Sequence, residues 1–196
     1  MGDFWNRFWY SMLKMSQKEM SNIDFFDLLL ACIMAVITVQ LLGLLYARIC
    51  NKARNLRKEV LIMLLVMVML LMWEIAVTGR EQMSLRTIRT EIWWFGKNMD
   101  DNTANFLNVM FFVPFGIVTT WLQKWEKGWR RILITGCLSF WMSASIEISQ
   151  YIMARGYTEL VDLETNVFGG IVGAVLAIAL EKLRKKEEKI NVGQSL

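Results

Sequence analysis

The chain has 196 residues, of which 55% are hydrophobic and 20% are charged, and its formal net charge is +4. This composition is too apolar for an ordinary soluble domain and is typical of a helical membrane protein. The absence of His, together with only three Cys, excludes the usual zinc sites and His-activated nucleophiles, so we expect neither a metal nor a cofactor.

Residues 1–24 form a segment in which aromatic and charged residues alternate. Phe4, Trp5, Phe8 and Trp9 fall near helical spacing, which predicts an amphipathic helix lying at the membrane interface. A loosely ordered tail is the alternative. The segment lacks the short apolar core and the cleavage site of a signal peptide, so we expect the next apolar run to remain as an anchor.

Apolar runs predict membrane spans at 26–47, 60–78, 105–123, 131–153 and 166–181. The fifth run is shorter than the roughly 20 residues that a span needs, so we expect it to lie in thinned membrane or to begin below the interface. Gln40, midway along the first run, should hydrogen-bond to a neighbouring helix. The predicted fold is an all-α polytopic membrane protein with an interfacial N-terminal helix (1–24), a membrane helix bundle (25–181) and a basic cytoplasmic tail (182–196).

Lys and Arg are concentrated in the connections 48–59 and 124–131 and in the C-terminal tail. Because cytoplasmic loops are enriched in these residues, we predict a multi-pass protein with its N-terminus outside and its C-terminus in the cytoplasm. The basic residues flank apolar runs and do not form one stripe. Their placement favours anchoring at membrane lipids over nucleic-acid binding.

The longest connection between predicted spans covers residues 79–104. Its apolar residues are interleaved with charges, which predicts a short helix or re-entrant piece at the outer interface that includes Ile88, Ile92, Trp93 and Phe95. Asp100, Asp101 and Thr103 follow, and their side-chain oxygens are suited to cap the third span.

The third span begins with two amides and contains a proline. Asn105 and Asn108 are three residues apart and share a helix face, which should point into the bundle. Pro114 lacks an amide hydrogen and should kink the helix, and Gly116 leaves room for a close neighbour. A packing kink with two satisfied amides would explain the same residues without a functional site.

The fourth span contains a carboxylate, Glu147, within an apolar run. An ionisable residue at that depth is costly and usually marks function. Ser143, Gln150 and Tyr151 follow helical spacing with Glu147 and predict one polar stripe. A structural acid that is hydrogen-bonded to its neighbours is the alternative.

The fourth and fifth spans are joined by a polar loop. Arg155 is positioned to pair with Glu147, while Asp162 could either join the same site or cap the fifth span. Asn166, in the first turn of that span, should face the same pocket. The small residues Gly169, Gly170 and Gly173 predict a packing face for another helix, either the third or the fourth span.

Two segments, NFLNVMFFVPFG and SIEISQYIMARGYTELVDLETNVFGGIVGA, strongly resemble the VanZ-like family of small integral membrane proteins. Many members of that family carry an Asn-Leu-x-Pro-Phe segment before the third span, whereas residues 84–88 here read Ser-Leu-Arg-Thr-Ile. The positions that match the family pattern are Asn108, Phe112, Pro114, Phe115, Gly116, Glu147, Gln150, Arg155, Gly156, Asp162, Asn166, Gly169, Gly170 and Gly173.

The resemblance implies a cell-envelope role in the bacterial plasma membrane, because the namesake of the family is associated with resistance to the lipoglycopeptide antibiotic teicoplanin. We expect an outward-facing pocket that binds an envelope lipid, a cell-wall precursor or the drug. Its expected ligand-binding residues are Asn105, Asn108, Glu147, Gln150, Arg155, Asp162 and Asn166.

Two other functions remain open from the sequence. Glu147 and Asp162 could be the acid and base of an intramembrane enzyme that modifies an amphiphilic lipid, although no nucleophile stands out. The chain could also be a transporter or scaffold, and the absence of an obvious internal repeat argues against a carrier built from repeats. The sequence leaves the oligomeric state and the charge state of Glu147 open.

Overall fold

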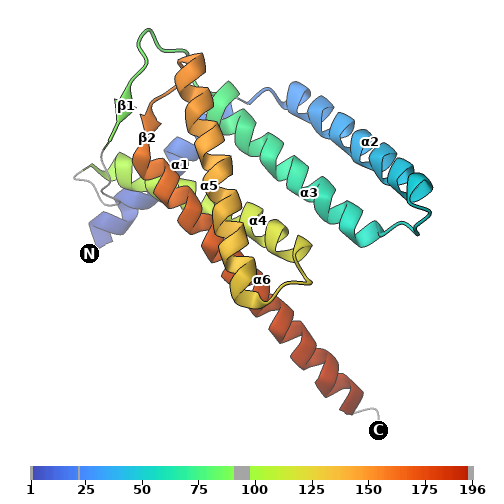
Figure 1. Cartoon of the computed structure of the whole chain (residues 1–196). Helices are drawn as coiled ribbons and strands as arrows, with labels where there is room; N and C mark the ends of the chain where they lie inside the picture. The colour runs from blue at the N-terminus through green and yellow to red at the C-terminus, as the bar shows by residue number, and fades with distance from the viewer. Residues whose placement is uncertain (1, 22, 91–97, 194–196) are drawn as a thin grey trace.

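The computed structural model describes residues 2–21, 23–90 and 98–193, and these residues are mainly helical. The described part contains five helices that are long and apolar enough to cross a membrane, which confirms the predicted fold class. Figure 1 shows the elements, which are α1 (Gly2–Ser21), α2 (Phe25–Ile49), α3 (Leu56–Trp73), the π-helical turn η1 (Glu74–Thr78), β1 (Ile88–Arg89), α4 (Met99–Leu122), α5 (Gly128–Met153), β2 (Thr158–Glu159) and α6 (Leu160–Gly193).

The third and fifth spans are longer than hydropathy predicted. α4 begins at Met99 and continues through Pro114 to Leu122. The prediction of a short fifth span was wrong, because α6 runs without interruption from Leu160 to Gly193 and includes most of the predicted tail. Polar residues in the first turns of α6 are buried and form hydrogen bonds with other helices. The helix therefore begins in a polar segment that hydropathy alone does not assign to a membrane span.

The predicted N-terminal helix is present as α1, and it packs against the beginning of α4. The Ser11 hydroxyl donates a hydrogen bond to Asp100 Oδ1 at 2.7 Å. The rings of Phe8 and Phe106 meet edge to face with centroids 5.6 Å apart. Asp100 therefore joins α4 to α1. It lies in the first turn of α4, whose N-cap residue is Asn98, whereas we predicted a cap from Asp100. Aromatic side chains such as Trp5 remain exposed on α1, as is typical of a helix at a membrane interface.

The helices α4 and α6 run in the same direction and share the most extensive contact between described elements. A Cβ atom added at Gly116 would lie 2.1 Å from the carbonyl oxygen of Gly170. Cβ atoms at Gly169 and Gly173 would lie 2.2 Å from carbonyl oxygens of α4. On its other side, Gly170 faces Ser139 of α5. The glycines thus bring the backbones of the two helices into direct contact.

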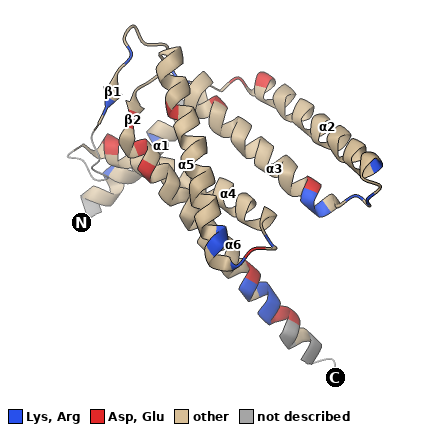
Figure 2. Ribbon diagram, viewed as in Figure 1, with Lys and Arg blue, Asp and Glu red and all other residues tan. Residues whose placement is uncertain are grey.

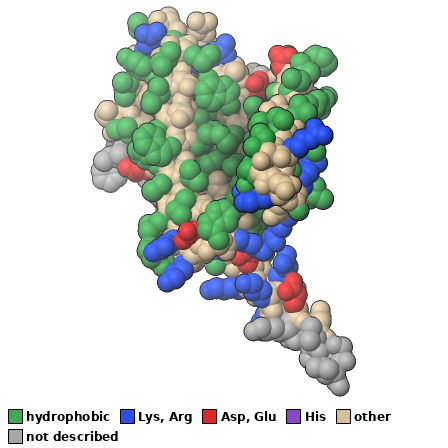
Figure 3. Space-filling view, turned by 45° about the vertical axis from the view of Figure 1, so that its right-hand side comes forward, with side chains coloured by type: hydrophobic (Ala, Val, Ile, Leu, Met, Phe, Trp, Pro, Cys, Tyr) green, Lys and Arg blue, Asp and Glu red, His purple; other side chains and the backbone are tan. Residues whose placement is uncertain are grey.

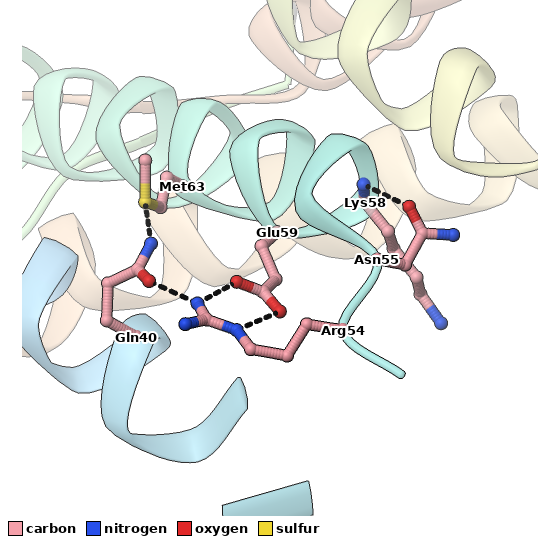
Figure 4. A network of polar contacts seen from close by, with 6 residues as sticks. All are labelled: Gln40, Arg54, Asn55, Lys58, Glu59 and Met63. Atoms are coloured by element: carbon pink, nitrogen blue, oxygen red, sulfur yellow. Dashed lines mark hydrogen bonds and ion pairs between the residues drawn. The ribbon is translucent and has the colours of Figure 1, made fainter. Parts of the chain in front are cut away.

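The α2–α3 hairpin stands to one side of α4, α5 and α6 (Figure 1), and α2 has no buried residue. Its two helices are joined by the polar network in Figure 4. Arg54 donates hydrogen bonds to Gln40 in α2 and to both carboxylate oxygens of Glu59 in α3. Gln40 also donates to the sulfur of Met63 at 3.2 Å, so its predicted interhelical bonding is confirmed. These contacts hold the turn between α2 and α3 together.

Candidate functional site

The longest connection pairs with the loop between α5 and α6. Residues Ile88–Arg89 form β1, which pairs in parallel with β2 at Thr158–Glu159. A second, antiparallel bridge joins Gln82 to Arg155. Of the two predicted forms, a short helix or a re-entrant piece, the helix is therefore wrong at 88–89, because that backbone is extended and pairs with the neighbouring loop. The predicted apolar positions at 92, 93 and 95 lie outside the described residues.

A partly open cavity of about 100 Å³ lies where η1, α4, α5 and α6 meet near this loop. Its apolar walls include side chains from α1, α3 and α4, with Met15 contributed by α1. The cavity brings together five of the seven predicted ligand-binding residues with one arginine that we did not predict. The polar residues that line it are Arg80, Asn108, Glu147, Gln150, Asp162 and Asn166.

The carboxyl groups of the cavity are held by donors from neighbouring elements. Asp162 Oδ1 accepts a hydrogen bond from Asn108 Nδ2 at 2.8 Å, which joins α6 to α4. Glu147 Oε2 accepts from the backbone N–H of Glu159 at 2.9 Å, which joins α5 to β2. Each carboxylate side chain has about four acceptor positions, so capacity remains for further donors. Both residues are only 7% exposed, so their free acceptor positions lie inside the protein.

Asp162 has a structural role in addition to its position at the cavity. It lies in the first turn of α6, where we predicted that it could cap the helix. Its side chain instead accepts from Asn108, so the polar start of α6 is fixed by a contact with α4. Asn166, one turn later, donates through Nδ2 to Ser143 Oγ of α5 at 2.9 Å. Three helices are thus connected through these side chains.

Gln150 links α5 to the π-helical turn η1. Its Nε2 atom donates to the carbonyl oxygen of Ala76 at 2.7 Å, and the residue is 1% exposed. Its Oε1 atom and Arg80 Nε are both buried without a hydrogen-bond partner among the described residues. Because buried polar atoms are normally satisfied, these two atoms are available to a polar group in the cavity. The partner of Gln150, Ala76, lies in η1, and single π-helical turns of this kind are frequent at functional sites.

The arginine that lines the cavity is Arg80, whereas we predicted Arg155. The guanidinium of Arg155 donates to the carbonyl oxygens of Thr78 and Arg80 and does not line the cavity, so it supports the end of η1. Arg80 lines the cavity, and its charge acts on both carboxyl groups. Gly156, which has a φ of 73°, packs against Arg80, and a Cβ atom there would lie 2.8 Å from Arg80 Cδ.

No sequence signal pointed to Arg80, because it lies beyond the second span and outside the motif segments. Asn105 is buried in α4 but does not line the cavity. Tyr151 is 40% exposed and lies away from the predicted polar stripe. The buried polar face of α5 is longer than predicted and consists of Arg131, Thr135, Ser139, Ser143, Glu147 and Gln150.

Five membrane-length helices, four of which line a polar cavity, define a multi-pass membrane protein. The model of the VanZ/LLP1 family matches residues 59–181, and the chain belongs to this family. All six polar residues of the cavity lie within the matched range, whereas α1 and α2 precede it. Comparisons with curated proteins and with solved structures gave no match.

Proposed function

We propose that this protein lowers susceptibility to lipoglycopeptide antibiotics such as teicoplanin by binding an envelope molecule in its polar cavity. The cavity would open toward the outer face of the bacterial plasma membrane. The observation that carries the proposal is that six polar side chains line one cavity. They come from the segment just after η1 and from α4, α5 and α6. Polar groups at membrane depth are costly, and a ligand that uses them offsets this cost.

The chemistry of the lining favours a polar headgroup that carries both donors and acceptors. Glu147 and Asp162 accept hydrogen bonds, whereas the guanidinium of Arg80 donates them. The volume of about 100 Å³ is smaller than the roughly 300 Å³ or more of a typical drug-sized pocket. A headgroup of an envelope lipid or of a lipid-linked wall precursor therefore suits the cavity better than an entire lipoglycopeptide.

The test compares a Gram-positive host that expresses the wild-type protein with one that expresses Glu147→Gln. Replacing this carboxyl group by an amide should abolish teicoplanin protection at matched protein levels, because one of the two carboxyl oxygens of Glu147 becomes an N–H donor. Asp101→Asn is the control, since Asp101 is an exposed acid in the first turn of α4, near the same end of the bundle.

Susceptibility to teicoplanin and to vancomycin is measured in parallel. Protection that survives Glu147→Gln unchanged would contradict the cavity assignment. Equal loss of protection in Asp101→Asn would show that any loss of negative charge near this end has the same effect. Binding of a purified lipid-linked wall precursor, compared with teicoplanin itself, then identifies which molecule enters the cavity.

The presence of two carboxyl groups in one cavity favours a second function. Glu147 and Asp162 interact electrostatically, and such pairs serve as acid and base in many enzymes. An intramembrane enzyme that modifies an amphiphilic envelope lipid would use them in this way. Formation of a product from radiolabelled envelope lipid by the purified protein distinguishes catalysis from binding alone.

A further inference from the structure

A second hollow lies at the opposite end of the bundle. Lys and Arg residues gather at this end (Figures 2 and 3). It has a volume of about 280 Å³ and lies between the start of α3, the end of α4 and the distal half of α6. About 10–15 Å³ is enough for one water, so this hollow has room for a larger polar group. We call it the basic pocket, after the four cations that line it, which are Arg57, Lys124, Arg184 and Lys185.

The cations of the basic pocket come from three parts of the chain. Arg57 lies in the first turn of α3, Lys124 follows the end of α4, and Arg184 and Lys185 lie on α6. Their convergence depends on the fold, since these residues are far apart in sequence. Arg184 also pairs with Glu188 at 3.1 Å, but both side chains are largely exposed, and such pairs contribute little.

Glu181 is the acidic residue in the lining, and it is already paired. Its two carboxylate oxygens accept from Arg131 Nη1 and Nη2, each at 2.9 Å. Arg131 is buried and does not line the pocket. Because this two-point contact neutralises Glu181, the cations retain an excess of positive charge toward the hollow.

The charge of the pocket acts on Lys124, which lies between two membrane spans. Desolvation lowers the pKa of its amine, and the positive charges of Arg57, Arg184 and Lys185 lower it further, although Glu181 has the opposite effect. An anion among these cations would relieve their mutual repulsion.

The remaining wall of the pocket is apolar. Leu61, Trp121 and Leu180 lie beside the cations, and all three belong to membrane-length helices. The pocket therefore lies where the charged ends of the helices meet the apolar part of the membrane spans. A cation cluster at this level suits a phosphate that is attached to acyl chains, because the apolar wall would contact the chains.

We propose that the basic pocket binds the phosphodiester headgroup of an anionic membrane phospholipid. Arg57, Lys124 and Lys185 contact the phosphate oxygens, and the acyl chains lie along Leu61 and Leu180. The basic pocket shares no residue with the polar cavity, so this inference stands independently of the proposed function.

The test measures binding of a short-chain phosphatidylglycerol to the full-length protein in a nonionic detergent by titration calorimetry. Phosphatidylcholine with the same chains and inorganic phosphate are the two comparison probes. Phosphatidylglycerol should bind more tightly than both. Equal binding of phosphatidylcholine would overturn the requirement for an anion, and equal binding of inorganic phosphate would overturn the assignment to a lipid.

Paired substitutions locate the site. Lys124→Gln with Lys185→Gln should weaken phosphatidylglycerol binding by about tenfold or more. The matched control, Lys127→Gln with Lys186→Gln, removes the same charge from the same loop and helix outside the lining and should change binding by less than about threefold. An equal loss in both double variants would overturn the proposal.

A third double variant preserves the charge. Lys124→Arg with Lys185→Arg should retain phosphatidylglycerol binding, and its loss despite native helicity by circular dichroism would overturn the proposed role of positive charge. If the Gln double variant does not fold, the comparison of the three probes on wild-type protein still decides the proposal.

Discussion

At the scale of single residues, the buried charge of Arg131 is held by specific partners. Arg131 forms a two-point ion pair with Glu181, and its Nη2 atom also donates to the carbonyl oxygen of Thr120 at 2.8 Å. The side chain of Arg131 is 6% exposed. Removing one member of such a pair is costly because the other charge stays buried.

Glu181→Gln should therefore destabilise the protein by about 3 kcal/mol, since it leaves the Arg131 charge without its carboxylate. The free energy of unfolding in mixed micelles measures the effect. Glu188→Gln is the control, because it removes the acid of an exposed ion pair on the same helix and should change stability by less than about 1 kcal/mol. Equal effects of the two substitutions would contradict the structural role of the buried pair.

The residues of the polar cavity were partly predictable from the sequence. Glu147 stood out because an ionisable residue within an apolar run is costly, and Asp162 stood out because it lies about one helical turn before the fifth predicted span. Arg80 did not, since a cation in a connecting loop is ordinary, and its approach to the carboxyl groups depends on how that loop packs against Gly156. Arg155 was placed in the same pocket by its position in the chain, but its guanidinium turns toward the end of η1.

At the scale of elements, contact between α4 and α6 positions the cavity. Asn108 and Asp162 can meet only if the two helix backbones approach closely, and glycines on both helices permit this. The motif glycines indicated helix packing from the sequence. Their partners were not predictable, because small residues allow contact with any neighbour of suitable shape.

Gly116→Ala should weaken the contact between α4 and α6, since its Cβ would lie 2.1 Å from a backbone oxygen that cannot rotate away. We expect a loss of about 1–3 kcal/mol in stability, the usual cost of overpacking. Gly136→Ala in α5 is the matched control, because its Cβ would make an ordinary contact at 3.5 Å with Ile171. Thermal unfolding of both variants tests this, and equal stability would contradict the close contact.

At the scale of the whole molecule, the two hollows lie at opposite ends of the bundle. The basic connections and the distal part of α6 share one end (Figure 2), while β1, β2 and the polar cavity lie toward the other. By the charge distribution, we propose that the basic end faces the cytoplasm. The polar cavity would then face the cell exterior, where an envelope ligand is accessible.

Labelling of single cysteines tests this orientation. In a variant with Cys32, Cys50 and Cys137 replaced by Ser, Ser84→Cys should react with a membrane-impermeant maleimide in intact cells. Lys127→Cys should react only after the membrane is permeabilised. The reverse pattern would place the polar cavity in the cytoplasm and contradict an outward-facing site.

The apolar runs and motif spacing were sufficient to predict five membrane helices and most of the polar residues that line the cavity. They could do so because the cost of burying charge and backbone in lipid constrains each segment locally. The start of α4, the length of α6, the pairing of β1 with β2 and the position of Arg80 depended on tertiary contacts. Each of these features is stabilised by a partner that is distant in the chain, and hydropathy and local spacing carry no information about such partners.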